Sequence, residues 1–163
     1  MSHRLRAFLL PVVAFTLFAA GCAKQYLPNT DVEDTDDNRR AVMFCEKYRK
    51  AVERRDAAGI LAMVSPKYYE DGGNVDASDD LDFDGLKEYL SQQFADSKAI
   101  RYEIRYRRII WKPEVRQAFV DYTYSASFKI PGPEGKDEWR RLISENRLVL
   151  SVEGEDFKIL AGL

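Results

Sequence analysis

The sequence predicts an α+β domain in which helices come first along the chain and long antiparallel strands follow. Two observations lead to this prediction. Between residues 37 and 97, apolar side chains recur every three or four positions, which is the spacing of helices that bury one face. From Ile100 onward, apolar and polar side chains alternate, which is the spacing of strands.

Three helices are expected before the sheet. The first runs over about residues 36–55, where Asp36 and Asp37 offer N-capping oxygens. A shorter helix, AAGILAMVS, ends at Pro66. An acidic loop then leads to the third helix, GLKEYLSQQFADS, which we expect Asp84 to cap.

The strand region begins with IRYEIRY and continues through VRQAFVDYTYSASFKI to two final strands, joined by a tight turn at Glu153–Asp156. The alternation slips near Arg108–Ile110, which predicts a bulge or bend. On the polar face of the sheet we expect mixed charges that pair across strands, accompanied by three apolar residues: Ile109, Trp111 and Phe119.

The N-terminus carries a targeting pattern. Arg4 and Arg6 precede the apolar run AFLLPVVAFTLFAA, and Gly21-Cys22 follows, which is the layout of a secretory signal peptide over residues 1–21. The small residues before the cysteine resemble the lipobox of bacterial lipoproteins, although Ala19 stands where that family prefers Leu. The alternative is an ordinary signal peptide cleaved near a chance cysteine.

The lipoprotein resemblance implies that Cys22 carries lipid, palmitate included, and anchors the protein in the cell envelope. The absence of Asp at position 23 resembles lipoproteins of the outer membrane that face the periplasm of a Gram-negative host.

The rest of the chain divides into two parts: residues 22–36 are predicted to form a flexible acidic tether, and residues 37–163 to form one domain. With the signal removed, 23 basic and 27 acidic side chains remain, which argues against nucleic acid as a partner. Cys45 is expected to be a buried, inert thiol rather than a reactive one.

Two local phrases resemble the nuclear-transport-factor-2-like (NTF2-like) superfamily, which includes polyketide-cyclase-like and ketosteroid-isomerase-like proteins. They are the Phe83-Asp84-Gly85 lead-in to the third helix and the closing hairpin VEGEDFKILAGL, where Phe157 replaces a frequent Trp. The resemblance implies that helices pack on a curved antiparallel sheet to form a cone-shaped barrel around a pocket. Members often dimerise through the outer sheet face, so a homodimer is an open alternative.

If the apolar face of the sheet is concave, six polar side chains point into the cone. They could line a pocket for a small, partly apolar ligand, or they could fill a core. A proton-abstracting site lacks its base, because Asp121 and Glu145 alternate outward and the sole histidine, His3, lies in the signal. No cofactor is expected. The six candidate residues are Tyr102, Tyr106, Tyr122, Tyr124, Ser144 and Asn146.

The stretch DDLDFDGLKEYL contains the opening of an EF-hand calcium loop. Position 12 of such a loop needs a bidentate Glu, but here it is Ser91, and the helix begins inside the loop. Helix capping within a solvated acidic loop is therefore predicted. A weak calcium site of another kind is the alternative, formed by Asp79, Asp80, Asp82 and Asp84.

Together these observations favour a lipid-anchored, non-enzymatic domain that binds a partner protein or a small ligand at the envelope. One alternative is a small-molecule isomerase, dehydratase or cyclase that uses tyrosine hydroxyls in the cone, and another is a structural assembly subunit. The enzyme predicts a pocket with a buried carboxylate of raised pKa. The binding module predicts a filled or apolar cone and an exposed apolar patch near Trp111 or Trp139.

Overall fold

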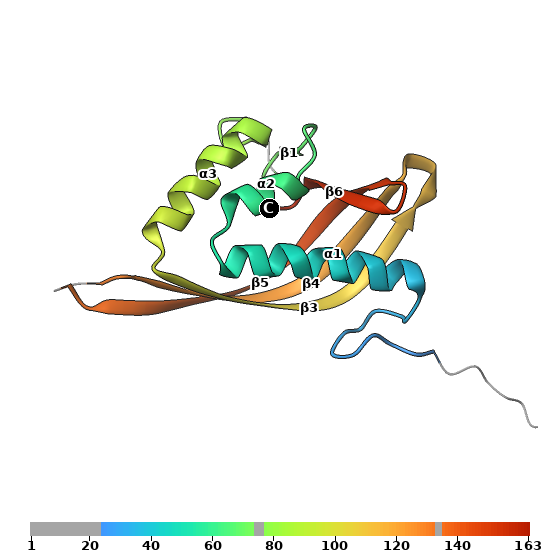
Figure 1. The fold of residues 1–163 in the computed structure, drawn as a ribbon, viewed down its shortest axis with the longest axis horizontal. Coiled ribbons are helices and arrows are strands. Elements are labelled where there is room, and N and C mark those ends of the chain that lie inside the picture. Colours follow the sequence, from blue (N-terminus) through green and yellow to red (C-terminus); the bar gives the residue numbers. More distant parts are fainter. Residues whose placement is uncertain (1–23, 74–76, 133–134) are drawn as a thin grey trace, which may run out of the picture.

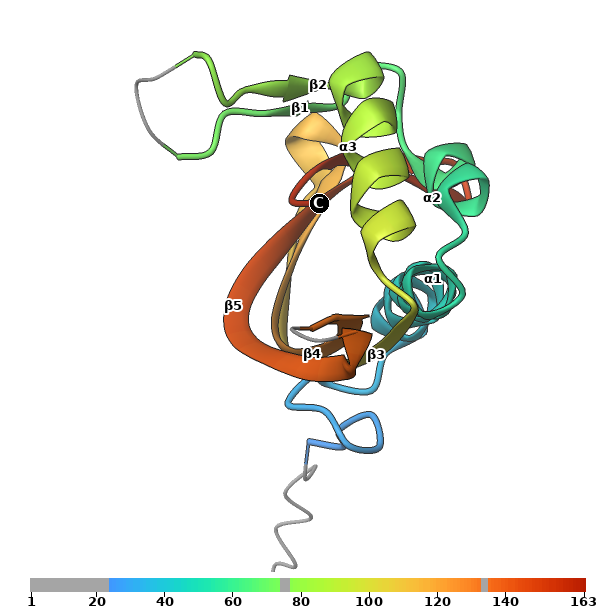
Figure 2. The same cartoon turned by 90° about the vertical axis from the view of Figure 1, so that its left-hand side faces the viewer.

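The computed structural model describes residues 24–73, 77–132 and 135–163 (Figure 1). Its helices lie on one side of a four-stranded antiparallel sheet of order β3-β4-β5-β6, as the sequence predicts. The sheet curls around the helices to form the expected cone (Figure 2). The helices are α1 (Asp36–Glu53), α2 (Ala57–Met63) and α3 (Phe83–Asp96), and the sheet strands are β3 (Ala99–Lys112), β4 (Gln117–Pro131), β5 (Asp137–Glu153) and β6 (Asp156–Ala161). A small separate hairpin is formed by β1 (Tyr69–Glu70) and β2 (Leu81–Asp82).

The first and third helices are capped by side chains that lie earlier than the sequence analysis expected. The hydroxyl of Thr35 accepts the backbone N–H of Asn38 at the start of α1, and a carboxylate oxygen of Asp82 accepts that of Gly85 at the start of α3. A capping residue has extended backbone and precedes the first turn. The predicted capping residues were Asp36, Asp37 and Asp84. They were wrong because each of them lies within the first turn of its helix and not before it.

The predicted slip in the first long strand is a shift of pairing register between Tyr106 and Arg108. The extra residue turns the following side chains to the other face of the sheet. Trp111 therefore faces the helices, with its ring centroid 6.2 Å from that of Phe157, and Ile109 packs against the core. The prediction that Ile109 and Trp111 lie on the outer face was wrong for this reason.

Residues 24–35 fold against the domain instead of forming a flexible tether. Leu27 and Val32 are buried in the core, and the Leu27 N–H donates to the Val32 carbonyl at 2.9 Å across a tight turn. The N–H of Asp31 donates to the Tyr106 carbonyl at 2.9 Å, which fixes the segment along the edge of β3. The described part of the expected tether thus belongs to the domain.

Helix α1 covers the rest of that sheet edge. The Arg49 guanidinium donates to the Tyr102 carbonyl at 2.9 Å, while the Tyr102 N–H donates to the Glu53 carboxylate at 3.2 Å. Arg49 also forms ion pairs of 2.8 Å with Glu46 and Glu53. These side chains satisfy backbone groups that an edge strand would otherwise leave exposed.

The opposite edge of the sheet is covered only in part. Strand β6 pairs with β5 from Val149 to Glu153, and within the described ranges no strand pairs with the other side of β5 before that point. The hairpin of β4 and β5 extends beyond α3 (Figure 1). The edge of β5 between residues 137 and 145 is therefore open.

The prediction for Cys45 is confirmed. Its side chain is fully buried in α1, and burial raises the pKa of the thiol above its ordinary range. A buried thiol that stays protonated is a poor nucleophile. Cys45 therefore serves as a small apolar residue of the core.

Candidate functional site: the two faces of the sheet

The helix-facing side of the sheet holds all six polar residues that the sequence analysis placed inward. Tyr122 of β4 stands opposite Tyr106 of β3 and Asn146 of β5, and Tyr124 stands opposite Ser144. Opposite residues in an antiparallel pair share a face of the sheet. The set therefore lies together on the concave side: Tyr102, Tyr106, Tyr122, Tyr124, Ser144 and Asn146.

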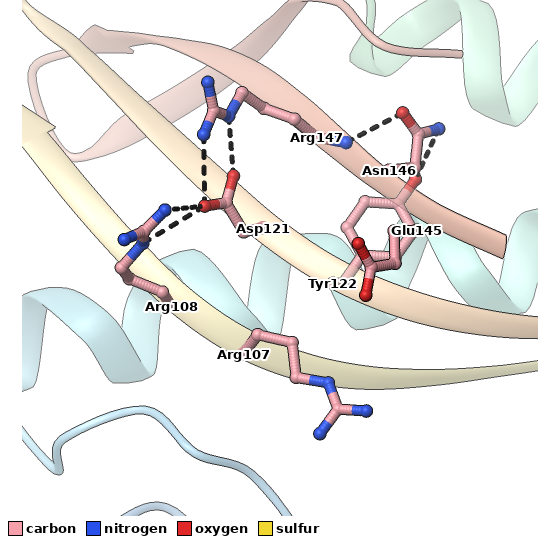
Figure 3. Close-up of a pocket in the computed structure, with 7 residues that line it drawn as sticks. All are labelled: Arg107, Arg108, Asp121, Tyr122, Glu145, Asn146 and Arg147. Atoms are coloured by element: carbon pink, nitrogen blue, oxygen red, sulfur yellow. Dashed lines mark hydrogen bonds and ion pairs between the residues drawn. The ribbon is translucent and has the colours of Figure 1, made fainter.

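Contacts between phenols connect this inner face to α1. The hydroxyls of Tyr48 and Tyr122 both interact with the Tyr102 hydroxyl, and the rings of Tyr48 and Tyr102 meet edge to face with their centroids 6.2 Å apart. The Asn146 side-chain amide donates to the Tyr122 hydroxyl at 3.2 Å (Figure 3) and to the Gly162 carbonyl at 3.1 Å. The tyrosines thus contact mainly one another and the end of the chain.

These rings fill the inner face instead of lining an open chamber. Tyr122 is only 1 % exposed, and its ring centroid lies 6.2 Å from that of Tyr124, which in turn lies 5.4 Å from that of Tyr102. Burial raises the pKa of Tyr102 to about 12 and raises that of Tyr122 further. Within the described residues, every buried side-chain nitrogen and oxygen has a hydrogen-bond partner. Tyr102, Tyr106 and Tyr122 therefore belong to a packed core, while Tyr124, Ser144 and Asn146 lie at its part-exposed margin.

One carboxylate reaches a tyrosine of this face, and the sequence analysis missed it. The Tyr106 hydroxyl donates to Glu46 at 3.0 Å, and the second Glu46 oxygen accepts from Arg49 at 2.8 Å. The Glu46 side chain is 34 % exposed, so it lies at the rim of the core beside α1. The only signal in the sequence was the spacing of Glu46 and Arg49 on one side of a helix.

The outer face, the side of the sheet away from the helices, has a different composition. Its central strand carries short hydroxyl side chains, namely Thr123, Ser125 and Ser127, between the longer side chains of β3 and β5. Two shallow grooves of about 680 and 220 Å³ lie along these strands. The flanking residues are mostly charged: Arg101, Glu103, Arg105, Arg108, Arg141, Glu145 and Arg147.

Asp121 organises the larger groove (Figure 3). Its carboxylate pairs with Arg147 at 2.6 Å and with Arg108 at 2.7 Å, so it joins β3, β4 and β5. The hydrogen bond from Arg147, followed by that from Arg108, lowers the pKa of Asp121. The guanidinium of Arg147 also lies 5.6 Å from the centre of the Phe119 ring, which is the apolar residue correctly placed on this face.

The N-terminal segment adds a second acidic residue to the outer face. Asp31 pairs with Arg105 and with Arg107, each at 2.9 Å. The hydrogen bond from Arg105, together with that from Arg107, lowers the pKa of Asp31. Both acidic residues are therefore neutralised by two arginines each.

Exposed apolar side chains gather toward the free end of β5. Trp139 is exposed, with the Arg101 guanidinium 4.6 Å above its ring centre. Leu142 and Ile143 are 50 % and 58 % exposed. Trp139 and Ile143 share the outer face, opposite Lys129 and Ser125, whereas Leu142 stands opposite Ala126 on the other face. Of the two tryptophans named in the sequence analysis, Trp139 is thus the exposed one, whereas Trp111 donates to the Asn38 side chain at 2.8 Å and is part of the packed interior.

Two described carboxylates of the acidic loop before α3 have partners within the protein. Asp82 caps the helix, and Asp80 accepts a hydrogen bond from the Tyr69 hydroxyl. Across the described ranges, no three His, Cys, Asp or Glu side chains are arranged to hold a metal ion, so the calcium alternative gains no support. Cys22 lies outside the described residues. No described helix is both long and apolar enough to cross a membrane.

Comparisons with known proteins agree on the fold and give no close relative. No protein-family model matches the chain, and no curated protein matches it. Solved structures do match, at low identity, so they show the fold alone. That fold is the NTF2-like cone, as the sequence analysis expected.

Three solved structures illustrate the match. A provisionally named scytalone dehydratase from Novosphingobium aromaticivorans aligns with a TM-score of 0.65 and 12% identity over 79% of this chain and 85% of its own. A conserved protein from Planctomyces limnophilus aligns with a TM-score of 0.64 and 8% identity over 77% of this chain and 92% of its own. An NTF2-like superfamily protein from Salmonella enterica aligns with a TM-score of 0.62 and 7% identity over 77% of this chain and 87% of its own.

Proposed function

We propose that this protein is a non-catalytic binding module of the cell envelope, anchored by lipid on Cys22, that recognises a protein partner with the outer face of its sheet. The observation that carries the proposal is the hydrogen-bonded tyrosine core on the inner face. A cone filled in this way leaves no room for a substrate beside its hydroxyls. The outer face, by contrast, offers grooves, arginines and hydroxyls to another molecule.

The distribution of charge supports the same choice. Three acidic residues in the described ranges have lowered pKa values. Arginines hold Asp31 and Asp121 at the outer face, and Lys98 and Lys129 hold Asp137 at the start of β5. Glu46 contacts Tyr106, but it is also paired with Arg49. A general base must be free to take a proton from a bound substrate, whereas the Glu46 carboxylate is held by Tyr106 and by the ion pair to Arg49.

A small-molecule enzyme is the second candidate, because solved structures with this fold include the provisionally named scytalone dehydratase. In that case Tyr106 and Glu46 are the pair that would move a proton, after the ion pair to Arg49 opens. The fold by itself does not favour this candidate, since one fold hosts many activities.

Native mass spectrometry of the purified full-length protein separates the two candidates. The binding module predicts the mass of the processed, lipidated chain with no co-purified small molecule. A bound molecule that is kept in Thr123→Val but lost in Tyr122→Phe would contradict the proposal and favour the enzyme. Thr123 is the matched control because it neighbours Tyr122 and points to the opposite face.

Partner recognition by the outer face is tested with a photo-cross-linking amino acid in the full chain, in its own membrane. A probe at Ser125, on the floor of the smaller groove, is expected to give a discrete cross-linked product. The control probe replaces Gln92, an exposed residue of α3. Equal products at both positions, or none at Ser125, would contradict the use of the outer face.

The lipid anchor is supported by the sequence of residues 4–22 and is tested separately. Cys22→Ser is expected to abolish incorporation of labelled palmitate and to release the protein from the membrane fraction. Cys45→Ala should leave both properties unchanged, because Cys45 is buried in the core. Membrane retention and labelling that survive Cys22→Ser would refute the anchor without affecting the outer face.

A further inference from the structure

The open edge of β5 has features that a second strand would complete. Residues 137–145 have no partner strand on that side in the described part of the chain, whereas α1 and residues 24–35 cover the opposite edge. Leu142 and Ile143, the most exposed apolar pair on β5, both lie on the open stretch. An unpaired edge with exposed apolar side chains is a template for another strand.

The backbone groups that face this edge can be identified from Arg147. The Arg147 N–H donates to the side-chain oxygen of Asn146 at 2.7 Å. The Arg147 carbonyl oxygen faces Gly162, because a Cβ atom added to that glycine would lie only 1.9 Å from it. Both backbone groups of Arg147 therefore point away from β4. In an antiparallel strand the N–H and C=O of one residue share an edge, and the edge alternates along the chain. Glu145, Ile143 and Arg141 therefore present their backbone groups to the open edge.

The side chains of these same three residues lie on the outer face. They stand opposite Thr123, Ser125 and Ser127 of β4, in that order. Neither Arg141 nor Glu145 forms an ion pair within the described residues, although Arg141 donates to the Ser125 hydroxyl at 3.0 Å. An unpaired cation and an unpaired anion thus flank Ile143 at equal spacing.

We propose that a second copy of this chain pairs with the open edge in antiparallel register, centred on Ile143. Each Ile143 then faces its counterpart, and each Arg141 faces Glu145 of the other copy, so that one contact contains two ion pairs. This register joins two outer-face charges that have no ion pair within the described residues, whereas centring on Trp139 would oppose Arg141 to Asp137, which Lys98 and Lys129 already hold. Centring on Arg141 would oppose Arg141 to itself and Asp137 to Glu145, while centring on Leu142 would oppose Arg141 to Ile143 and form neither ion pair.

This pairing does not depend on the proposed function, but it would extend the surface that the function uses. The two-fold axis of an antiparallel edge contact is normal to the sheet, so both outer faces point the same way. The two rows of hydroxyl residues become parts of one continuous surface. The same patch serves both copies, and the contact therefore closes as a dimer and does not propagate into a fibre.

Cysteine cross-linking of the purified full-length protein tests the register. Facing residues of a hydrogen-bonded antiparallel pair have Cα atoms about 5.5 Å apart, within the range that a disulfide spans. Ile143→Cys is expected to give a disulfide-linked dimer under mild oxidation. Arg141→Cys is the matched control, because two copies of residue 141 would lie about 14 Å apart. The wild-type chain sets the background from Cys22 and the buried Cys45.

Charge reversal followed by sedimentation equilibrium tests the ion pairs. Arg141→Glu should raise the dimer dissociation constant at least about tenfold, because two attractive pairs become repulsive. Arg141→Glu combined with Glu145→Arg should return the dissociation constant to the wild-type value, because the pairs are attractive again. Glu103→Arg, in the same row of the outer face but on β3, should leave it unchanged. A wild-type chain that stays monomeric at about 100 μM, equal cross-linking at positions 141 and 143, or a double variant that fails to recover would each overturn the proposal.

Discussion

The two faces of one sheet differ in how their polar groups are satisfied. On the inner face, Tyr102 and Tyr122 are neutral and buried, and Tyr48 of α1 packs against them. On the outer face, Asp31 and Asp121 are charged and are bonded to arginines in contact with water. Adjacent residues of one strand, such as Tyr122 and Thr123, belong to opposite environments. The comparison indicates that the buried groups of the inner face stabilise the fold, and we propose that recognition falls to the outer face.

The largest expected effect comes from Tyr122→Ala. Removing a fully buried ring should lower the free energy of unfolding by about 3–5 kcal/mol, because a cavity remains and the Asn146 amide loses one of its two acceptors. Chemical denaturation measures this change. Thr123→Ala, one residue away on the outer face, should lower it by about 0.5 kcal/mol at most. Similar losses for the two variants would abolish the distinction between the faces.

Tyr102→Phe sharpens the comparison by removing one oxygen and no ring. The hydroxyls of Tyr48 and Tyr122 both interact with that oxygen, so the variant removes a polar partner from two buried phenols. The free energy of unfolding should fall by about 2 kcal/mol, measured by denaturation in urea. A loss below about 0.5 kcal/mol would mean that water reaches these hydroxyls, contrary to a filled core.

The smallest effect is expected at Asp121, although it bonds two arginines. Asp121→Asn should lower the free energy of unfolding by about 1 kcal/mol, because ion pairs at an exposed face are weak. The loss should shrink in about 1 M salt, which screens such pairs. Since the arginines lower the pKa of Asp121, its contribution is present at neutral pH and is lost as the pH falls through the lowered value. A loss that neither salt nor acid reduces would assign Asp121 to the interior instead.

The alternation of the sequence predicted which side chains share a face, but not how they bond. The period of two placed all six inner residues correctly because it depends only on neighbours along a strand. It failed at Ile109 and Trp111, because the register shift at Arg108 turns the following residues over. The ring contact between Tyr48 and Tyr102 joins residues far apart in sequence, so no local pattern could indicate it.

The N-terminal segment shows a second limit. Residues 24–35 are polar and acidic, and such a composition usually predicts a flexible chain. Leu27 and Val32 are nevertheless enough to dock the segment, because a tight turn brings them to the core together. The contact between Tyr106 and Glu46 was missed for a related reason, since it depends on how α1 lies on β3.

The central claim, a filled tyrosine core, is tested most directly by titrating the tyrosines. Burial raises the pKa values of Tyr48, Tyr102, Tyr106 and Tyr122 above the unfolded value of about 10. The folded state therefore holds these protons more tightly. The contribution of these tyrosines to the free energy of unfolding is fully present below about pH 10. Above that pH the free energy of unfolding falls by roughly 1.4 kcal/mol per pH unit for each group.

Absorbance of phenolate and circular dichroism should be followed together as the pH is raised. The account predicts that these four tyrosines stay protonated above pH 10 and then ionise in one step with loss of the fold. Reversible ionisation of all four near pH 10 with the fold intact would contradict it. The cone would then be open to water, and the enzyme would become the better candidate.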